Sequence, residues 1–336
     1  MKVPRPAQEI MGCLHTSRLT QRKRILLRVI SDVICILLVA AGIFGIKFGS
    51  NPYKRGFFCD DESIKHPFLE DTISVTLAAC IGMFLPLVVI IILEFLLRKK
   101  GRGYVVSTNK TFGKSASWIY SIYNTIIVFV FGMAVTQFLT EVGKYSIGRL
   151  RPHFLTLCNP DWTKVNCSAG YITDDVCTST DTEMMTEARL SFPSGHSSFS
   201  MYCMLYLILY LEARLSCQAV TLVRPLSQLF CFCLGFFTCL SRISDYKHHW
   251  SDVLSGSVLG MVVCILVVLS VSDFGHVLRI RASICKADNG VLAASVNHTV
   301  EEEPDTHYNG RPLQDSQPSR QTSNLSHIVK IEQLDL

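Results

Sequence analysis

The side chains with the clearest chemical potential lie in three short polar segments, and long apolar runs separate these segments. The first segment carries Lys144 and Arg151, seven positions apart. Because two helical turns would bring residues at this spacing to one face, we expect both cations on the same side of a helix. A basic cluster that touches lipid headgroups would give the same pattern, so the first segment alone does not identify a site.

The second segment is Ser191-Phe-Pro193-Ser194-Gly195-His196, which stands directly before an apolar run. The free N–H groups at a helix start, together with the positive end of the helix dipole, form a natural anion seat. Gly195 would let a ligand approach the backbone closely, and Ser194 can cap the helix or donate a hydrogen bond. An ordinary helix start with an incidental histidine explains this segment equally well.

The third segment contains Arg242, His248 and Asp252. Residues 248 and 252 are four apart, so a helix would place them on one face within hydrogen-bonding reach. A carboxylate on one imidazole nitrogen fixes the tautomer and leaves the other nitrogen free as a nucleophile. His249 is rotated by about 100° and should not share that role. The alternative is a polar interfacial belt anchored by Trp250.

Together the three segments favour phosphoryl chemistry. Lys144, Arg151 and Arg242 suit a dianionic phosphoryl group, and arginine can give it forked hydrogen bonds. Such transfers are catalysed mainly by positioning and by stabilising charge on the phosphoryl oxygens, which cations and the amides of Ser194 and Gly195 could do.

We therefore expect His248 to attack phosphorus and form a phosphohistidine, with Asp252 orienting it. His196 would protonate the leaving alkoxide and then take a proton from the hydrolytic water. The carboxylates near these segments lack the grouping of a magnesium or two-metal site, so we expect no metal and no cofactor.

The composition indicates the elements that must position these residues. The chain has 336 residues, 49% hydrophobic and 18% charged, and a soluble domain carries about a quarter charged residues. Its apolar runs predict an all-α, polytopic membrane protein. The basic residues flank these runs and form no separate basic domain, which argues against nucleic-acid binding. Six transmembrane helices are expected at 29–48, 72–97, 118–140, 197–214, 225–241 and 252–272.

Charge asymmetry predicts the orientation of these spans. Lys and Arg crowd the segments before span one, after span two and after span six, so these segments should be cytoplasmic. The three polar segments then share the exoplasmic or luminal face. The chain divides into a cytoplasmic N-terminal segment (1–28), a six-helix membrane domain (29–272) and a cytoplasmic, disordered tail (273–336). Asn166 begins a glycosylation sequon on the non-cytoplasmic side.

Cysteine and glycine spacing leaves two questions open. Cys59, Cys158, Cys167 and Cys177 fall in the outer polar segments, where one or two disulfides are expected and three complete pairings are possible. Gly256-Ser-Val-Leu-Gly260 fits close helix packing, either within the chain or with a second subunit.

The three segments resemble the signature motifs of the type 2 phosphatidic acid phosphatase superfamily: Lys-x6-Arg-Pro, Pro-Ser-Gly-His and Ser-Arg-x5-His-x3-Asp. Their surroundings look closer still to the animal lipid phosphate phosphatases (phospholipid phosphatases), and the likeness spans about 25–275. The stretches that carry it are 59–65, 144–154 (KYSIGRLRPHF), 195–204 (GHSSFSMYCM) and 241–253 (SRISDYKHHWSDV).

This resemblance implies Mg²⁺-independent dephosphorylation of phosphatidate, lysophosphatidate, sphingosine 1-phosphate and ceramide 1-phosphate. It implies a homo-oligomer and a glycan at Asn166. From the topology we expect the plasma membrane; the Golgi and the endoplasmic reticulum are also compatible, since each places the site on the exoplasmic or luminal side. The implied roles are His248 as nucleophile, Asp252 as its partner, His196 as acid and base, and phosphate binding by Lys144, Arg151, Ser194, Gly195 and Arg242.

Three rival functions remain at this stage. A non-catalytic relative that binds lipid phosphates would have lost motif residues, whereas His196, Arg242 and His248 are intact here. A transporter or channel would carry charges or broken helices near mid-membrane, and the polar residues here lie at the span ends. A phosphatase for a soluble substrate fits the chemistry, and the local likeness argues against it.

Overall fold

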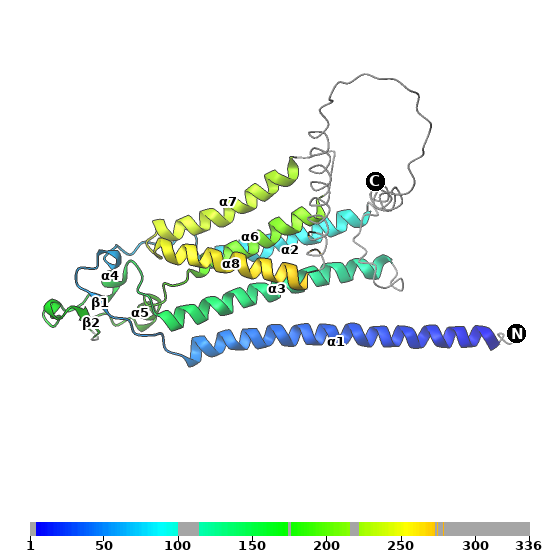
Figure 1. Ribbon diagram of the computed structural model, residues 1–336, viewed down its shortest axis with the longest axis horizontal. Coiled ribbons are helices and arrows are strands. Elements are labelled where there is room, and N and C mark those ends of the chain that lie inside the picture. The colour runs from blue at the N-terminus through cyan, green and yellow to red at the C-terminus, as the bar shows by residue number, and fades with distance from the viewer. Residues whose placement is uncertain are drawn as a thin grey trace, which may run out of the picture.

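The computed structural model of the chain describes residues 5–99, 114–173, 176–215 and 222–272, together with 274 and 278. Six long helices run back and forth along one axis (Figure 1). In chain order the elements are α1 (Arg5–Gly49), β1 (Phe57–Phe58), η1 (Glu62–Ile64), α2 (Val75–Lys99), α3 (Lys114–Ile147), α4 (Phe154–Cys158), η2 (Cys167–Ala169), β2 (Tyr171–Ile172), α5 (Thr182–Glu187), α6 (Gly195–Arg214), α7 (Val223–Ser244) and α8 (Trp250–Val271).

Within the described residues, five of the long helices are long and apolar enough to cross a membrane. These stretches are Ile25–Gly49, Val75–Leu97, Trp118–Ile147, Val223–Ser244 and Trp250–Val271. Each matches an expected span. α3 continues to Ile147, beyond the expected end at 140, and this extension carries Lys144 on the helix.

Helix α6, which we expected as the fourth span, is long enough but too polar to be one of these five. Its 20 residues would extend about 30 Å, which is the thickness of the hydrocarbon core. α6 packs against α2, α3, α7 and α8, and its tyrosines find acceptors there. The hydroxyls of Tyr202 and Tyr206 donate to the carbonyls of Phe129 (2.9 Å) and Thr125 (2.8 Å). A helix surrounded by other helices can be polar because its neighbours, not lipid, satisfy its polar groups.

The two glycines of α8 lie against α6 of the same chain. A Cβ atom on Gly256 would lie 2.4 Å from the carbonyl oxygen of Ser194, and one on Gly260 would lie 2.1 Å from that of Ser198. Side chains larger than hydrogen would therefore push the two helices apart. These glycines let the backbone of α8 come close to the start of α6, where the second polar segment lies.

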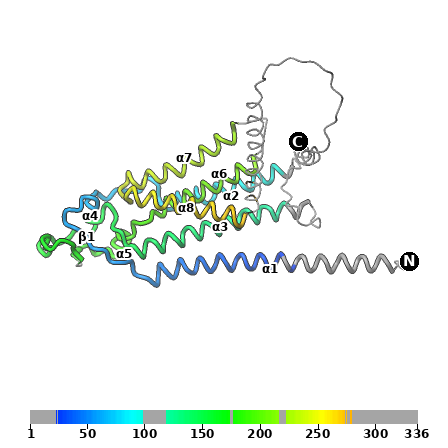
Figure 2. Tube along the Cα trace, in the orientation of Figure 1, coloured from blue at the N-terminus to red at the C-terminus, as the bar shows by residue number. Residues whose placement is uncertain are grey.

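The N-terminal helix begins earlier than expected. α1 starts at Arg5, so helical backbone runs through most of the segment 1–28 that we expected to precede the first span. Pro6 lies in the first turn, where its missing N–H group has no intrahelical partner to lose. α1 packs along α3 at the edge of the bundle (Figure 2). The expected disordered tail, 273–336, lies outside the described residues apart from 274 and 278.

The connections 50–74, 148–194 (described apart from 174 and 175) and 245–249 gather at the end of the bundle opposite the start of α1 (Figure 1). There β1 pairs with β2 in antiparallel register, Phe57 opposite Ile172. The structure contains one of the three possible cysteine pairings. Its disulfides join Cys59 to Cys167 and Cys158 to Cys177. This end of the bundle, which we call the loop end, brings the three polar segments together.

Substitution of Gly260 by alanine tests the close contact between α6 and α8. We expect Gly260→Ala to destabilise the folded protein by about 1–3 kcal/mol, because the added methyl group must displace backbone. Gly45→Ala is the matched control, since a Cβ at Gly45 meets no atom within 4 Å. The readout is the apparent Tm in detergent micelles. Equal values for the two variants would contradict the packing described here.

Candidate active site

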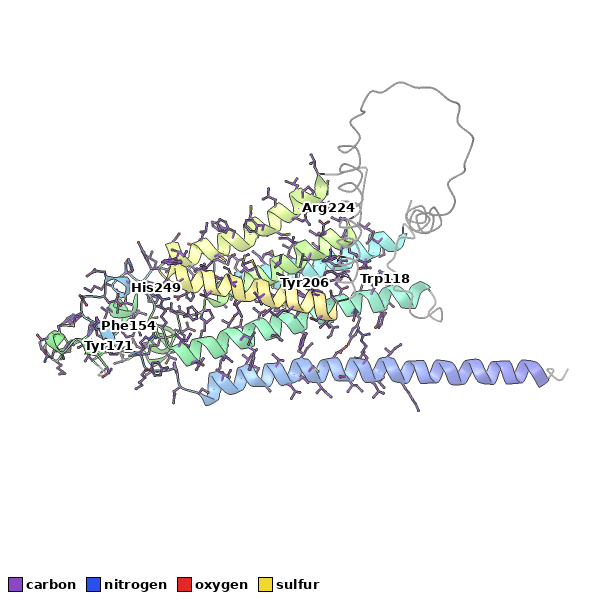
Figure 3. The ribbon with its side chains drawn as sticks, viewed as in Figure 1. Trp118, Phe154, Tyr171, Tyr206, Arg224 and His249 are labelled. Atoms are coloured by element: carbon purple, nitrogen blue, oxygen red, sulfur yellow. A yellow bond between two sulfur atoms is a disulfide. The ribbon has the colours of Figure 1, made fainter. Side chains whose placement is uncertain are left out.

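A cavity of about 730 Å³ opens at the loop end. This volume lies within the usual range for small-molecule sites, roughly 300–1,000 Å³. Of the residues proposed from the sequence, the wall includes Lys144, Arg151, Gly195, His196, Arg242 and His248, whereas Ser194 and Asp252 lie behind it. His249, the neighbour of His248 in the chain, also lies at the loop end, whereas Trp118 lies far from the loop end along the bundle (Figure 3).

Lys144 and Arg151 both reach the cavity, but not along one helix. The expectation of two continuous helical turns is wrong, because α3 ends at Ile147 and Gly148 adopts a positive φ of 57°. The chain then turns, and Arg151 enters the cavity from the connection that follows. Its guanidinium pairs with Glu187 at the end of α5. The spacing therefore predicted the meeting of the two cations for the wrong geometric reason.

Arg242 enters from the last turn of α7 and is 1% exposed. Its two terminal nitrogens bind carboxylates, Asp71 at 3.0 Å and Asp245 at 2.6 Å. The Nε atoms of Arg242 and Arg151 are buried and find no hydrogen-bond partner in the described part of the chain. Each guanidinium therefore keeps unused donor capacity beside the cavity.

The ring of His248 is oriented by a backbone carbonyl. Its Nδ1 lies 2.7 Å from the carbonyl oxygen of Ser191, so Nδ1 must carry the proton and donate it. Nε2 is then unprotonated, and it makes no hydrogen bond to any described residue. Burial, followed by the nearby charges of Arg151, Lys144 and His196, lowers the pKa of His248 well below its usual value. The imidazole is consequently neutral at physiological pH, with a free lone pair on Nε2.

The predicted hydrogen bond between His248 and Asp252 is wrong. Helix α8 begins only at Trp250, so the four-residue spacing does not apply across 248–252. His249 is the N-cap of α8, and Oδ2 of Asp252 accepts from its N–H and lies near its Nδ1, both at 3.1 Å. Asp252 therefore contacts the histidine that we had excluded. This capping box explains why the carboxylate points toward the start of its own helix.

Two residues of the polar segments, to which the sequence analysis assigned no role, connect Asp252 to the rest of the site. The Ser191 hydroxyl donates to Oδ2 of Asp252 at 2.6 Å, while its carbonyl holds His248. Arg149 donates to Oδ1 at 2.5 Å. Both residues lie inside or beside the polar segments, but only tertiary contacts reveal their role. Asp252 acts on His248 through Ser191, not directly.

At the start of α6, fewer backbone N–H groups are free to bind a phosphate than the sequence led us to expect. The N–H of Ser194 donates to the backbone carbonyl of Asp252 at 3.0 Å, so this amide is already paired, and phosphate binding by Ser194 stays a prediction. The amides from Gly195 onward have no intrahelical acceptor in the first turn. A Cβ on Gly195 would lie 3.7 Å from Nζ of Lys144, which shows how close this ammonium lies to the helix start.

Unsatisfied nitrogen atoms concentrate in this cavity. Nε2 of His196 is buried and unpartnered in the described chain, as are the Nε atoms of Arg151 and Arg242. In the part of the chain that the structure describes, the one other buried side-chain nitrogen or oxygen without a partner is Nε2 of His249. Buried polar groups are normally satisfied, so such a cluster points to a ligand that brings its own oxygen acceptors. An oxyanion such as phosphate fits this requirement.

No group of three or more His, Cys, Asp or Glu side chains that could hold a metal ion occurs among the described residues. The expectation of a metal-free site stays a prediction.

Comparison with known proteins places these features in a family. Residues 125–275 match the model of the PAP2 superfamily. The chain is 47% identical to rat phospholipid phosphatase 1 over 249 residues, covering 73% of this chain and 85% of the relative. It is 43% identical to human phospholipid phosphatase 2 over 248 residues, covering 73% and 83% respectively. No solved structure matches the chain.

Proposed function

Since this chain belongs to the phospholipid phosphatase family of the PAP2 superfamily, we propose that it removes the phosphate monoester from lipid phosphates through a phosphohistidine, without a metal. The chain is an integral membrane phosphatase. The proposed substrates are phosphatidate, lysophosphatidate, sphingosine 1-phosphate and ceramide 1-phosphate.

One observation carries the proposed mechanism. A neutral imidazole, His248, exposes an unprotonated Nε2 to a cavity whose buried arginines hold unused donors. The arginine and lysine charges would bind a phosphate dianion, and the hydrogen bond to Ser191 keeps the nucleophilic nitrogen aimed at the cavity. Positioning and charge stabilisation of this kind supply most of the catalysis in phosphoryl transfer.

In the first step the substrate phosphate replaces Glu187 as the partner of Arg151 and contacts Lys144 and Arg242. The bound dianion favours protonation of His196. Nε2 of His248 attacks phosphorus, the bond from phosphorus to the alkoxide oxygen breaks, and His196 gives its proton to that oxygen.

In the second step water replaces the departed alcohol. His196 takes a proton from this water as its oxygen attacks phosphorus, and the bond from phosphorus to Nε2 breaks. Inorganic phosphate leaves, and His248 returns to its neutral form. His196 then releases the proton taken from water, because burial and the charge of Arg242 lower the pKa of His196 to about 4 in the empty cavity; binding of the next phosphate dianion favours its protonation again. Throughout, Nδ1 of His248 donates to the carbonyl of Ser191, which stabilises the positive charge of the phosphorylated ring.

Substitution of the nucleophile tests this mechanism. We expect His248→Ala to release phosphate from lysophosphatidate in EDTA at below about 1% of the wild-type rate, because the variant lacks the attacking nitrogen. His249→Asn is the matched control, since asparagine preserves an N-cap and His249 does not line the cavity.

The wild type should also yield an acid-labile phosphohistidine at position 248 after a quench with substrate bound. If His248→Ala kept the activity of the wild type, as His249→Asn should, His248 would be ruled out as the nucleophile. A wild type that binds the lipid but releases no phosphate would instead identify a non-catalytic relative.

We also propose that α1, α2, α3, α6, α7 and α8 all span the membrane, with the cavity on the exoplasmic or luminal side. The basic flanks support this orientation, and so do two disulfides at the loop end, which persist in oxidising compartments. Residues 1–28 and 273–336 would then be cytoplasmic. Plasma membrane, Golgi and endoplasmic reticulum all satisfy this topology.

Glycosylation reports the orientation. Asn166 is exposed at the loop end, and its Oδ1 accepts from the Ser168 N–H at 3.1 Å, which leaves Nδ2 available for a glycan. Asn297 begins another sequon, Asn297-His-Thr, in the segment expected to be cytoplasmic. We expect a glycosidase-sensitive mass shift in the wild type and in Asn297→Gln, and its loss in Asn166→Gln. A shift that disappears in Asn297→Gln and persists in Asn166→Gln would reverse the topology.

A further inference from the structure

A carboxylate that the phosphoryl-transfer steps do not use lines the same cavity. Glu141 lies on α3, three residues before Lys144, and is 3% exposed. Its Oε1 accepts from Nε2 of Gln137 at 2.8 Å and lies 3.5 Å from Nζ of Lys47. Its Oε2 makes no hydrogen bond or ion pair with any described residue. A buried carboxylate thus presents one unused acceptor oxygen at the cavity.

The position of Glu141 along α3 sets its depth. With a rise of about 1.5 Å per residue, Glu141 lies about 4.5 Å further into the bundle than Lys144, and Gln137 about 10.5 Å further. The wall of the same cavity also includes Phe199, one helical turn beyond Gly195 on α6. If phosphate lies at Lys144 and Gly195, Glu141 and the apolar ring of Phe199 therefore line the wall about one turn further into the bundle.

A lipid phosphate has matching groups beyond its phosphate. Its phosphoester carbon is followed by a carbon that carries a hydroxyl, an amino group, an amide or an ester, and the hydrocarbon chain lies beyond. An ionised carboxylate can only accept hydrogen bonds. It would stabilise a hydroxyl or ammonium at that carbon and would face an ester without any donor.

We propose that Glu141 determines specificity by accepting a hydrogen bond from a donor on the carbon next to the phosphoester carbon. This inference rests on the proposed lipid phosphate phosphatase function. It favours lysophosphatidate and sphingoid phosphates, which carry such a donor, over phosphatidate, in which an ester occupies that carbon.

Gln137 holds the carboxylate in place for this role, and Lys47, at the end of α1, offsets part of its negative charge. Gln137 fixes Oε1, so that Oε2 is the oxygen left for a ligand. A purely structural alternative is that the Lys47–Glu141 pair only fastens α1 to α3.

Two substrates that differ in a single hydroxyl separate these roles. The probes are 1-oleoyl lysophosphatidate and its analogue without the 2-hydroxyl, and the readout is the ratio of their kcat/KM values in mixed micelles. A hydrogen bond to a charged group predicts a wild-type ratio of roughly 10 to 100. Glu141→Met, which has no acceptor oxygen, should bring the ratio close to one.

Lys47→Met is the matched control because it breaks the same ion pair and keeps the carboxylate, and it should retain the wild-type ratio. Glu141→Gln preserves side-chain shape and a weaker acceptor, so it should give an intermediate ratio and decides the question if Glu141→Met does not fold. If the ion pair only fastens α1 to α3, Glu141→Met and Lys47→Met should each lower kcat/KM equally for both substrates. The ratio would then keep its wild-type value.

Two other results overturn the inference in distinguishable ways. A wild type that hydrolyses both lipids at equal kcat/KM removes the role of Glu141 and leaves the proposed function intact. A wild type that hydrolyses neither lipid contradicts the proposed function itself.

Discussion

The carboxylate of Asp252 joins the three chain segments that meet at the cavity. It is fully buried, accepts from Ser191 and Arg149, and caps α8 through His249. The backbone carbonyl of the same residue accepts the Ser194 N–H at the start of α6. Removing one partner of a buried, hydrogen-bonded charge is strongly destabilising, so this contact set fixes how the segments lie relative to one another. The orientation of His248 follows from it, because Ser191 binds both the carboxylate and the imidazole.

Charge compensation shapes the rest of the cavity. Arg151 is paired with Glu187, and Arg242 is paired with Asp71 and Asp245. These acids neutralise cations that would otherwise repel one another, yet they leave buried Nε donors unsatisfied. A phosphate dianion can satisfy those donors and displace the more exposed Glu187, whose side chain is 56% exposed. The cavity is therefore already arranged for an anion before one arrives, and electrostatic preorganisation of this kind is effective in a low-dielectric site.

Much of the architecture follows from the sequence because long apolar runs dictate helices of membrane length. All six expected spans are helices, and the polar segments do meet at one end of the bundle. Predictions from helical spacing were wrong where a helix ends or begins between the two residues. The helix that carries Lys144 ends before Arg151, where Gly148 has a positive φ. Helix α8 begins only after His248, so the expected contact between His248 and Asp252 does not form. The roles of Ser191 and Arg149 depend on contacts between segments far apart in the chain, and no periodicity encodes those. The disulfide pairing was open for the same reason, since spacing does not specify which cysteines meet.

The central claim is that Nε2 of His248 faces the phosphate-binding cavity as the attacking atom. A structure of the protein with orthovanadate, which adopts the five-coordinate geometry of phosphoryl transfer, tests it most directly. We predict vanadium bonded to Nε2 of His248, vanadate oxygens contacting Arg151 and Arg242, and Nδ1 still donating to the carbonyl of Ser191. Vanadate bound without contact to His248, or an imidazole turned so that Nδ1 faces the cavity, would contradict the account.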